Sequence, residues 1–99
     1  MRFPVTDDTL AQLVGEQVEE QIANGGEFTA YDITRTLRQA QPYLDIPHAT
    51  VREWVHRYMQ NVLSEGFYIA SQAMFGSQTA IVYQPAYVPV IPSLPVSLN

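Results

Sequence analysis

Residues 48–68 read HATVREWVHRYMQNVLSEGFY, and this stretch decides the fold expected for the chain. Its apolar residues recur at i, i+3, i+4 and i+7, the pattern of an amphipathic helix. Gly66 is suited to closing that helix, and the aromatic pair after it favours a strand. The apolar stripe is Val51, Trp54, Val55, Tyr58, Met59 and Val62. The polar face is Ala49, Arg52, Glu53, His56, Arg57 and Gln60. We therefore expect a helix that leads directly into a strand.

The composition indicates one small domain. The chain has 99 residues, of which 46% are hydrophobic, and no cysteine. The lack of cysteine excludes a disulfide scaffold, a thiolate nucleophile and a Cys-ligated metal site. No apolar run follows Arg2, and no stretch approaches the roughly 18 apolar residues of a membrane span. We expect a soluble, cytoplasmic protein with no membrane partner.

Charge is distributed unevenly along the chain. The net charge is −5, and six of the ten acidic residues lie within residues 1–27. Four of the five arginines lie within residues 28–64, and lysine is absent. An acidic chain is not expected to bind nucleic acid indiscriminately. Arginine, however, suits bidentate contacts with phosphate or guanine, so the middle third is the candidate binding region.

The first helix is expected to begin after Thr6, a candidate N-cap, and to stop at Asn24-Gly25-Gly26. Its apolar stripe is Leu10, Leu13, Val14, Val18 and Ile22. Polar glutamines flank this stripe, which fits either a helix shared with a partner or a helix that faces only the domain core. The second interpretation is the simpler one.

A second helix is expected to begin at Thr29, which forms a variant capping box with Asp32. Residues 27–28 before it are at most a bridge-sized strand. The helix should run to about residue 39 or 41, since Pro42 ends it. It should bury Ile33 and Leu37 and turn Arg35 and Arg38 outward.

The connection 42–47 is expected to contribute Tyr43, Leu44 and Ile46 to the core between the helices. Three residues are candidates for the N-cap of the third helix, because Pro47 fits either the loop or the first helical turn. They are Asp45, Ile46 and His48.

Two strands are expected at residues 67–72 and 79–83, joined through residues 73–78. The final stretch 85–99 carries four of the seven prolines and favours an extended tail or linker. Its Pro-x-x-Pro spacing lacks the basic residue that usually orients such a ligand, so structural proline is the preferred interpretation.

The expected order is helix, short strand, helix, helix and hairpin, and it resembles a winged helix-turn-helix domain. Thr50-Val51, the apolar positions after it and Gly66-Phe67-Tyr68 resemble a recognition helix and the first strand of a wing. The resemblance implies an α+β fold that is mainly α. It has a three-helix core and a C-terminal β-hairpin wing over residues 1–84, followed by the proline-rich tail 85–99.

This resemblance implies DNA binding, with the third helix in the major groove. Carried over by position, phosphate contacts would come from Thr50, Arg35 and Arg38. His48 would stand at the start of the helix. The side chains that would face base edges or the DNA backbone are Arg52, Glu53, His56 and Arg57. The expected wing departs from the family pattern, because Met74, Phe75, Ser77 and Gln78 bring no cation.

Simpler interpretations compete with some of these assignments. Arg52 and Arg57 can be ordinary solvated arginines, and Glu53 can pair with Arg57 at i+4. Glu53-x-x-His56 has the spacing of di-metal bundles, but a second copy and further carboxylates are missing. No phosphate loop or nucleophile motif occurs. We therefore expect no enzyme activity, no metal and no cofactor.

The sequence thus predicts a small DNA-binding transcriptional regulator that acts as a homodimer, since four arginines are few for a monomer on double-stranded DNA. The alternative is a winged-helix protein-interaction module that does not bind DNA. In that case its contacts would come from the wing tip, Met74 and Phe75, or from the proline-rich tail.

Overall fold

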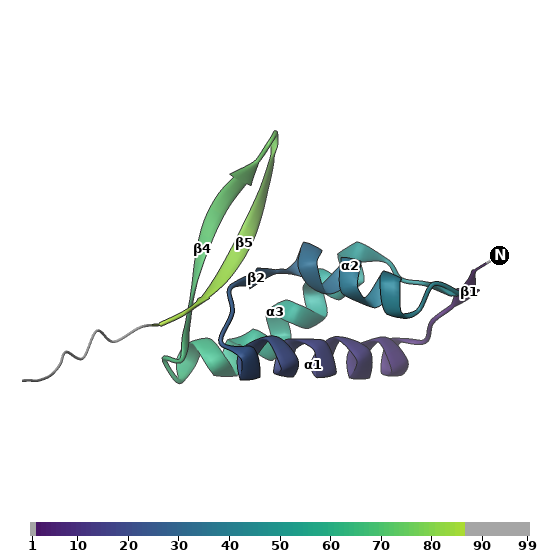
Figure 1. The fold of residues 1–99 in the computed structure, drawn as a ribbon, viewed down its shortest axis with the longest axis horizontal. Coiled ribbons are helices and arrows are strands. Elements are labelled where there is room, and N and C mark those ends of the chain that lie inside the picture. The colour runs from purple at the N-terminus through teal and green to yellow at the C-terminus, as the bar shows by residue number, and fades with distance from the viewer. Residues whose placement is uncertain (1, 87–99) are drawn as a thin grey trace, which may run out of the picture.

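A computed structural model describes residues 2–86 of the chain. Three helices form the body, and a long hairpin projects from it (Figure 1). The helices are α1 (Asp7–Asn24), α2 (Ala30–Ala40) and α3 (His48–Ser64). The strands are β1 (Phe3–Pro4), β2 (Phe28–Thr29), β3 (Leu44–Asp45), β4 (Tyr68–Phe75) and β5 (Gln78–Pro85). The described part is therefore an α+β fold that is mainly helical, as the sequence predicts. Residues 87–99, most of the predicted tail, lie outside the described residues.

Local sequence accounts for the ends of α1 and α2. The side chain of Thr6 accepts a hydrogen bond from the backbone N–H of Thr9 at 3.2 Å, and Gly25 ends α1 with a φ of 69°. At the start of α2, the predicted capping box forms: Thr29 and Asp32 exchange side-chain and backbone hydrogen bonds. Both predicted helix starts are confirmed.

The start of α3 differs from the expectation. The N-cap is Pro47, and no side chain caps the helix, so none of the three predicted N-cap residues holds that place. Pro47 has an extended backbone, and its carbonyl oxygen accepts the N–H of Val51 at 3.1 Å. The predicted core plug is partly wrong: Ile46 is fully buried, but Tyr43 is 71% exposed.

Strands β1 and β3 form a short parallel pair that the sequence did not reveal. Phe3 lies opposite Leu44, and the N–H of Phe3 donates to the carbonyl of Tyr43 at 2.6 Å. Each strand has two residues, and Pro4 within β1 gives no strand signal. The pair fixes the start of the chain to the connection between α2 and α3.

The hairpin is longer, and its turn tighter, than predicted. Strand β4 continues through Met74 to Phe75, and β5 begins at Gln78 and ends at Pro85, so that a two-residue turn joins them. Gly76 in this turn has a φ of 65°, which glycine adopts at little cost. The sheet order is β2, β5, β4, with all pairs antiparallel. The strand between the first two helices therefore pairs with the returning arm of the hairpin.

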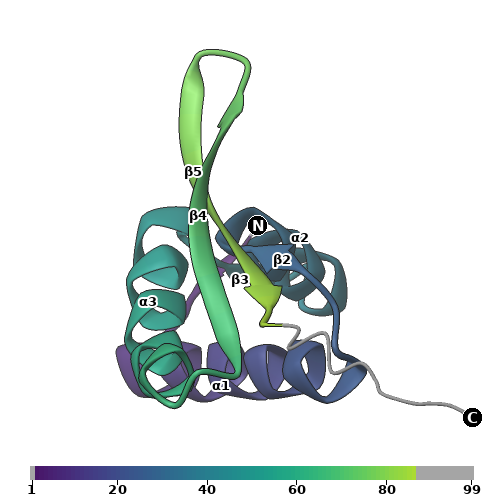
Figure 2. The same ribbon diagram turned by 90° about the vertical axis from the view of Figure 1, so that its left-hand side faces the viewer.

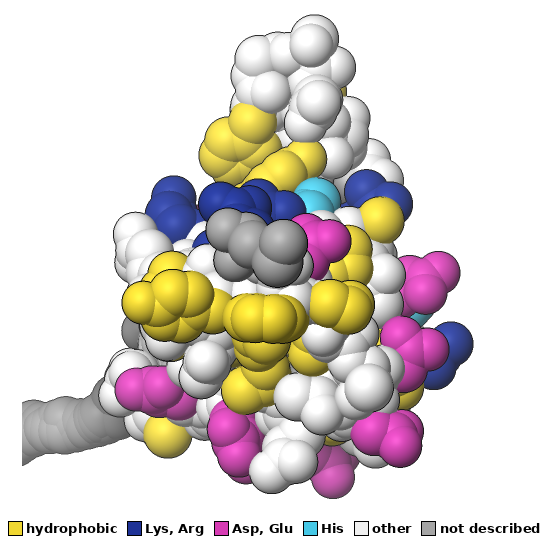
Figure 3. Space-filling view, turned by 90° about the vertical axis from the view of Figure 1, so that its right-hand side faces the viewer, with side chains coloured by type: hydrophobic (Ala, Val, Ile, Leu, Met, Phe, Trp, Pro, Cys, Tyr) yellow, Lys and Arg dark blue, Asp and Glu magenta, His cyan; other side chains and the backbone are white. Residues whose placement is uncertain are grey.

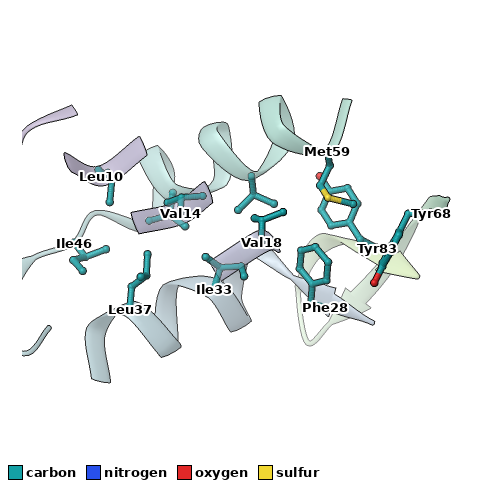
Figure 4. Packing of buried hydrophobic residues seen from close by; sticks show 12 residues of the cluster. Leu10, Val14, Val18, Phe28, Ile33, Leu37, Ile46, Met59, Tyr68 and Tyr83 are labelled. Atoms are coloured by element: carbon teal, nitrogen blue, oxygen red, sulfur yellow. The ribbon is translucent and has the colours of Figure 1, made fainter. Parts of the chain in front are cut away.

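The core lies where the three helices meet the base of the sheet (Figure 4). Aromatic rings close its sheet end: the ring centroid of Phe28 lies 6.0 Å from that of Tyr68 and 5.4 Å from that of Tyr83. Between α1 and α3, the hydroxyl of Tyr58 donates to the carbonyl of Ala11 at 2.9 Å, beside buried Gly15. The fully buried side chains are Leu10, Val14, Phe28, Ile33, Leu37, Ile46, Val51, Val55 and Met59. These contacts fix the direction in which the opposite face of α3 points.

Candidate nucleic-acid interface

A groove of about 500 Å³ lies between the polar face of α3, the first turn of α2 and one face of the hairpin. Figure 2 shows the hairpin standing over the helical layer beside α3. The helices contribute Ala30, Tyr31, His48, Arg52, Glu53, His56 and Arg57, and the strands contribute Gln72, Thr79, Ala80, Ile81 and Tyr83. Burial raises the pKa of the Tyr83 hydroxyl, which closes the inner end of the groove as a neutral group.

Five of the predicted contact residues line this groove: His48 at its edge, and four residues on the polar face of α3. Arg52, Glu53, His56 and Arg57 all line it and are all exposed, because Val51 and Val55 turn the opposite side of α3 into the core. A helix brings residues four apart onto one face, so Arg52 and His56 are neighbours, as are Glu53 and Arg57. The polar face of α3 is thus a solvent-facing wall of the groove.

The two arginines on α3 differ in their surroundings. The guanidinium carbon of Arg57 lies 4.8 Å from the ring centroid of Trp54, a cation–π geometry that holds the side chain along the helix. The suggested ion pair between Glu53 and Arg57 does not form, since Asp32–Arg35 is the ion pair present within residues 2–86. Arg52 makes no hydrogen bond or ion pair with any described residue. The guanidinium group of Arg52 is therefore available to a ligand.

The two arginines of α2 are engaged within the protein. Arg35 pairs with Asp32 of the capping box. Arg38 donates from both Nε and Nη2 to the carbonyl oxygen of Ile46, at 3.1 and 2.8 Å. Arg38 thus stabilises the turn into α3, a role that the sequence prediction of a phosphate contact missed. Both arginines line a shallower groove beside the first one, together with His48.

His48 connects α2 to α3. The Thr34 hydroxyl donates to the carbonyl of Ala30 at 2.9 Å, so His48 Nδ1 donates to Thr34 Oγ1 at 2.8 Å. The imidazole stacks on Tyr31, with ring centroids 4.2 Å apart. Nε2 is buried and has no hydrogen-bond partner among the described residues. Burial, followed by the charges of Arg52 and Arg38, lowers the pKa of His48. The imidazole is therefore neutral and packs between α2 and α3 at the edge of the groove.

Thr50 lies in the first turn of α3, half-buried, and lines none of the three grooves described for residues 2–86. Sequence reasoning missed Tyr31 instead. Besides stacking on His48, Tyr31 donates its hydroxyl to Gln78 Oε1 at 2.8 Å, which ties α2 to the hairpin. These partners are 47 residues apart, so no local pattern could have indicated the contact.

Charged side chains are distributed unevenly on one face of the molecule. Figure 3 shows arginine side chains in a band just below the hairpin, with most acidic side chains in view lying lower. The hairpin itself carries no charged residue from Gly66 to Ala86. No three His, Asp or Glu side chains within residues 2–86 gather as a metal site would require. The described helices include none that is both long and apolar enough to cross a membrane.

No protein-family model matches the chain, and neither the curated proteins nor the solved structures contain a match to it. The residues that line the groove are therefore the basis for a functional assignment.

Proposed function

We propose that this protein is a small DNA-binding transcriptional regulator of the winged-helix type, in which α3 reads the major groove and the β4–β5 hairpin is the wing. The order of the elements supports the fold assignment. A short strand between the first two helices pairs with β5, and the hairpin follows α3 directly. This arrangement leaves one face of α3 open to a ligand.

The observation that carries the proposal is the exposed face of α3, with Arg52 and Arg57 on it. A major groove about 12 Å wide admits a helix. The uncommitted fork of Arg52 suits the two acceptors of guanine or a phosphate. Arg57 lies along Trp54, from where it can reach the DNA backbone. Glu53 can accept a hydrogen bond from a cytosine amino group. His56 completes the face on the next turn.

Further phosphate contacts are proposed at the flank of α3. Thr50 in the first turn of α3 and Arg35 on α2 would approach the phosphate backbone of one DNA strand. His48 would act by holding α3 against α2, because its Nδ1 is bonded to Thr34 and its Nε2 is buried. Arg38 contributes mainly by holding the turn before α3 in place. The uncharged hairpin adds little phosphate affinity, so few contacts per subunit are expected and two subunits would bind together.

The test is fluorescence anisotropy of a labelled mixed-sequence duplex, titrated with the protein at several salt concentrations. Roughly three or four phosphate contacts per subunit give two subunits bound together a slope of about −6 in log K against log salt. Arg52→Ala should weaken binding and flatten the slope by about 1 per subunit if the side chain holds a phosphate. If it holds a base, the loss depends on the sequence of the duplex.

Arg2→Ala is the matched control, because it removes one exposed positive charge outside the groove. The proposal predicts a smaller loss for it than for Arg52→Ala or Arg57→Ala. Equal binding by wild type and by both α3 variants, all folded by circular dichroism, would remove the recognition face from the proposal.

A second function is favoured by the hairpin. Four large apolar side chains on it or just before it are more than half exposed: Phe67, Ile69, Met74 and Phe75. Such a surface is typical of protein contacts. If no duplex binds at low salt or after site selection, a protein-interaction module becomes the better assignment, with the predicted tail of residues 85–99 as a further contact.

A further inference from the structure

The outer edge of β4 has unpaired backbone groups. Phe67 accepts the N–H of Ala86 directly opposite it at 2.9 Å, so this pair is hydrogen-bonded, and such pairs alternate along an antiparallel ladder. The next pair, Tyr68 with Pro85, is then a non-hydrogen-bonded pair, which fits the absence of an N–H on proline. Strand β4 is an edge of the sheet formed by residues 2–86. The backbone groups that point outward, away from β5, are those of Ala70, Gln72 and Met74.

This edge lacks the features that usually keep edge strands apart. Exposed edges commonly carry lysine, proline or a bulge. Strand β4 has no charged residue and no proline, and its pairing with β5 is continuous from Tyr68 to Phe75. Its side chains also remain open to solvent: Ile69 is 52% exposed, Met74 65% and Phe75 54%.

The side chains of β4 complement a second copy of the same strand. Two antiparallel strands related by a two-fold axis place residues of the same face opposite each other. An even-numbered residue of one strand therefore lies opposite an even-numbered residue of the other. With Gln72 at the axis, Ile69 lies opposite Phe75 of the second copy, and Met74 lies opposite Ala70. Each exposed apolar side chain of the strand then gains an apolar neighbour, the type of pair that stabilises sheets.

Charge permits a second copy at this edge, although it opposes contact through the acidic surfaces. The chain carries a net charge of −5, and two copies repel wherever their acidic surfaces meet. Contact through β4 joins uncharged segments and keeps the acidic α1 helices out of the strand pair. We propose that β4 pairs antiparallel with β4 of a second copy, so that two three-stranded sheets become one sheet with Gln72 at its two-fold axis. This inference does not depend on DNA binding.

A charge exchange at Gln72 tests the pairing. Sedimentation velocity of the wild-type chain should show a monomer that converts to a dimer as concentration rises. Gln72→Lys places two ammonium groups opposite each other, and Gln72→Glu places two carboxylates, so either variant alone should dimerise about fivefold more weakly. An equimolar mixture of the two should recover the dimer. Gln12→Lys and Gln12→Glu, on the exposed side of α1, are the matched controls and should dimerise like wild type.

Amide hydrogen exchange gives a second readout, which does not rely on a substitution. As concentration rises, the N–H groups of Ala70, Gln72 and Met74 should become protected, whereas Ser71 and Ala73 are already paired with β5 and should change little. The proposal is overturned by a wild-type chain that stays monomeric at several hundred micromolar. A dimer unaffected by both Gln72 variants, or protection that does not alternate along β4, would overturn it equally. Loss of duplex binding with the dimer intact would count only against the DNA-binding proposal.

Discussion

The imidazole of His48 is held between two residues of α2: it donates to Thr34 at 2.8 Å and stacks on Tyr31. The ring thereby joins the first turn of α3 to α2. It does so in its neutral form, because the remaining nitrogen is buried without a partner among the described residues. Stability at the base of the groove is consequently linked to the protonation of one side chain.

The protein should lose stability as the solution becomes mildly acidic. Burial and the nearby charges of Arg52 and Arg38 lower the folded-state pKa of His48 below 6.5, so the unfolded chain binds a proton first. The contribution of His48 is fully present above about pH 6.5 and is lost as the pH falls below that value toward the folded-state pKa. Urea unfolding at about pH 7.5 and about pH 5 measures this loss as a difference in unfolding free energy.

His48→Asn keeps a donor for Thr34 and removes the titrating ring, so the difference in unfolding free energy between the two pH values should shrink. His56→Asn removes the other imidazole of the chain and is the control. A profile flattened as much by His56→Asn as by His48→Asn would contradict the assignment.

Arg38→Ala should destabilise the protein more than Arg35→Ala. Arg38 donates two hydrogen bonds to the carbonyl of Ile46, and its loss should lower the unfolding free energy by about 1–2 kcal/mol. Arg35 forms an exposed pair with Asp32, worth about 0–1 kcal/mol. Denaturant unfolding of both variants checks the order, and the reverse order would mean that the Arg38–Ile46 contact does not hold the turn.

Gly15 and Tyr58 should be energetically coupled. A Cβ built on Gly15 lies 2.8 Å from the Tyr58 hydroxyl oxygen, so Gly15→Ala must displace the ring and lengthen its bond to Ala11. Alanine otherwise favours a helix by about 1 kcal/mol over glycine. Gly15→Ala should therefore stabilise the protein in a Tyr58→Ala background and fail to do so in the wild type. A double-mutant cycle with additive free energies would contradict this coupling.

Tyr31→Phe should loosen the hairpin more than it affects the whole fold. The substitution keeps the ring stacked on His48 but removes the hydrogen bond to Gln78. Amide exchange should become faster at Gln78 and Ala80, whose N–H groups pair with β4 near the tip, and change less in α1. The free energy of global unfolding should fall by about 1 kcal/mol or less, because the lost hydrogen bond is exposed. Uniformly faster exchange in all elements would show that the bond supports the whole domain.

Local signals account for most of what the sequence predicted. Thr6, the Thr29–Asp32 capping box and the apolar periodicity of α3 each act within a few residues, so the three helices could be placed from them. Contacts between distant segments could not be predicted in this way. The β1–β3 pair has only two residues on each side, and the Tyr31–Gln78 bond exists only after the hairpin folds over α2.

The candidate site shows the same division. The spacing along α3 places Arg52, Glu53, His56 and Arg57 on one face, and the structure brings all four to the groove. Spacing could not reveal that Arg38 is engaged with Ile46, because that depends on the path of the connection. The length of the hairpin was underestimated because the connection was placed over residues 73–78, around Gly76-Ser77. The turn has two residues, so the pairing extends through Ala73, Met74 and Phe75.

The parallel pairing of Phe3 with Leu44 also decides where a reporter group can be attached. It anchors the N-terminal end of the described chain at the β1–β3 end of the helical layer, opposite the base of the hairpin (Figure 1). A dye or surface linker at Arg2 would thus sit away from β4. Immobilised protein would keep the hairpin edge free to meet a second copy, so surface-based measurements can use N-terminal attachment.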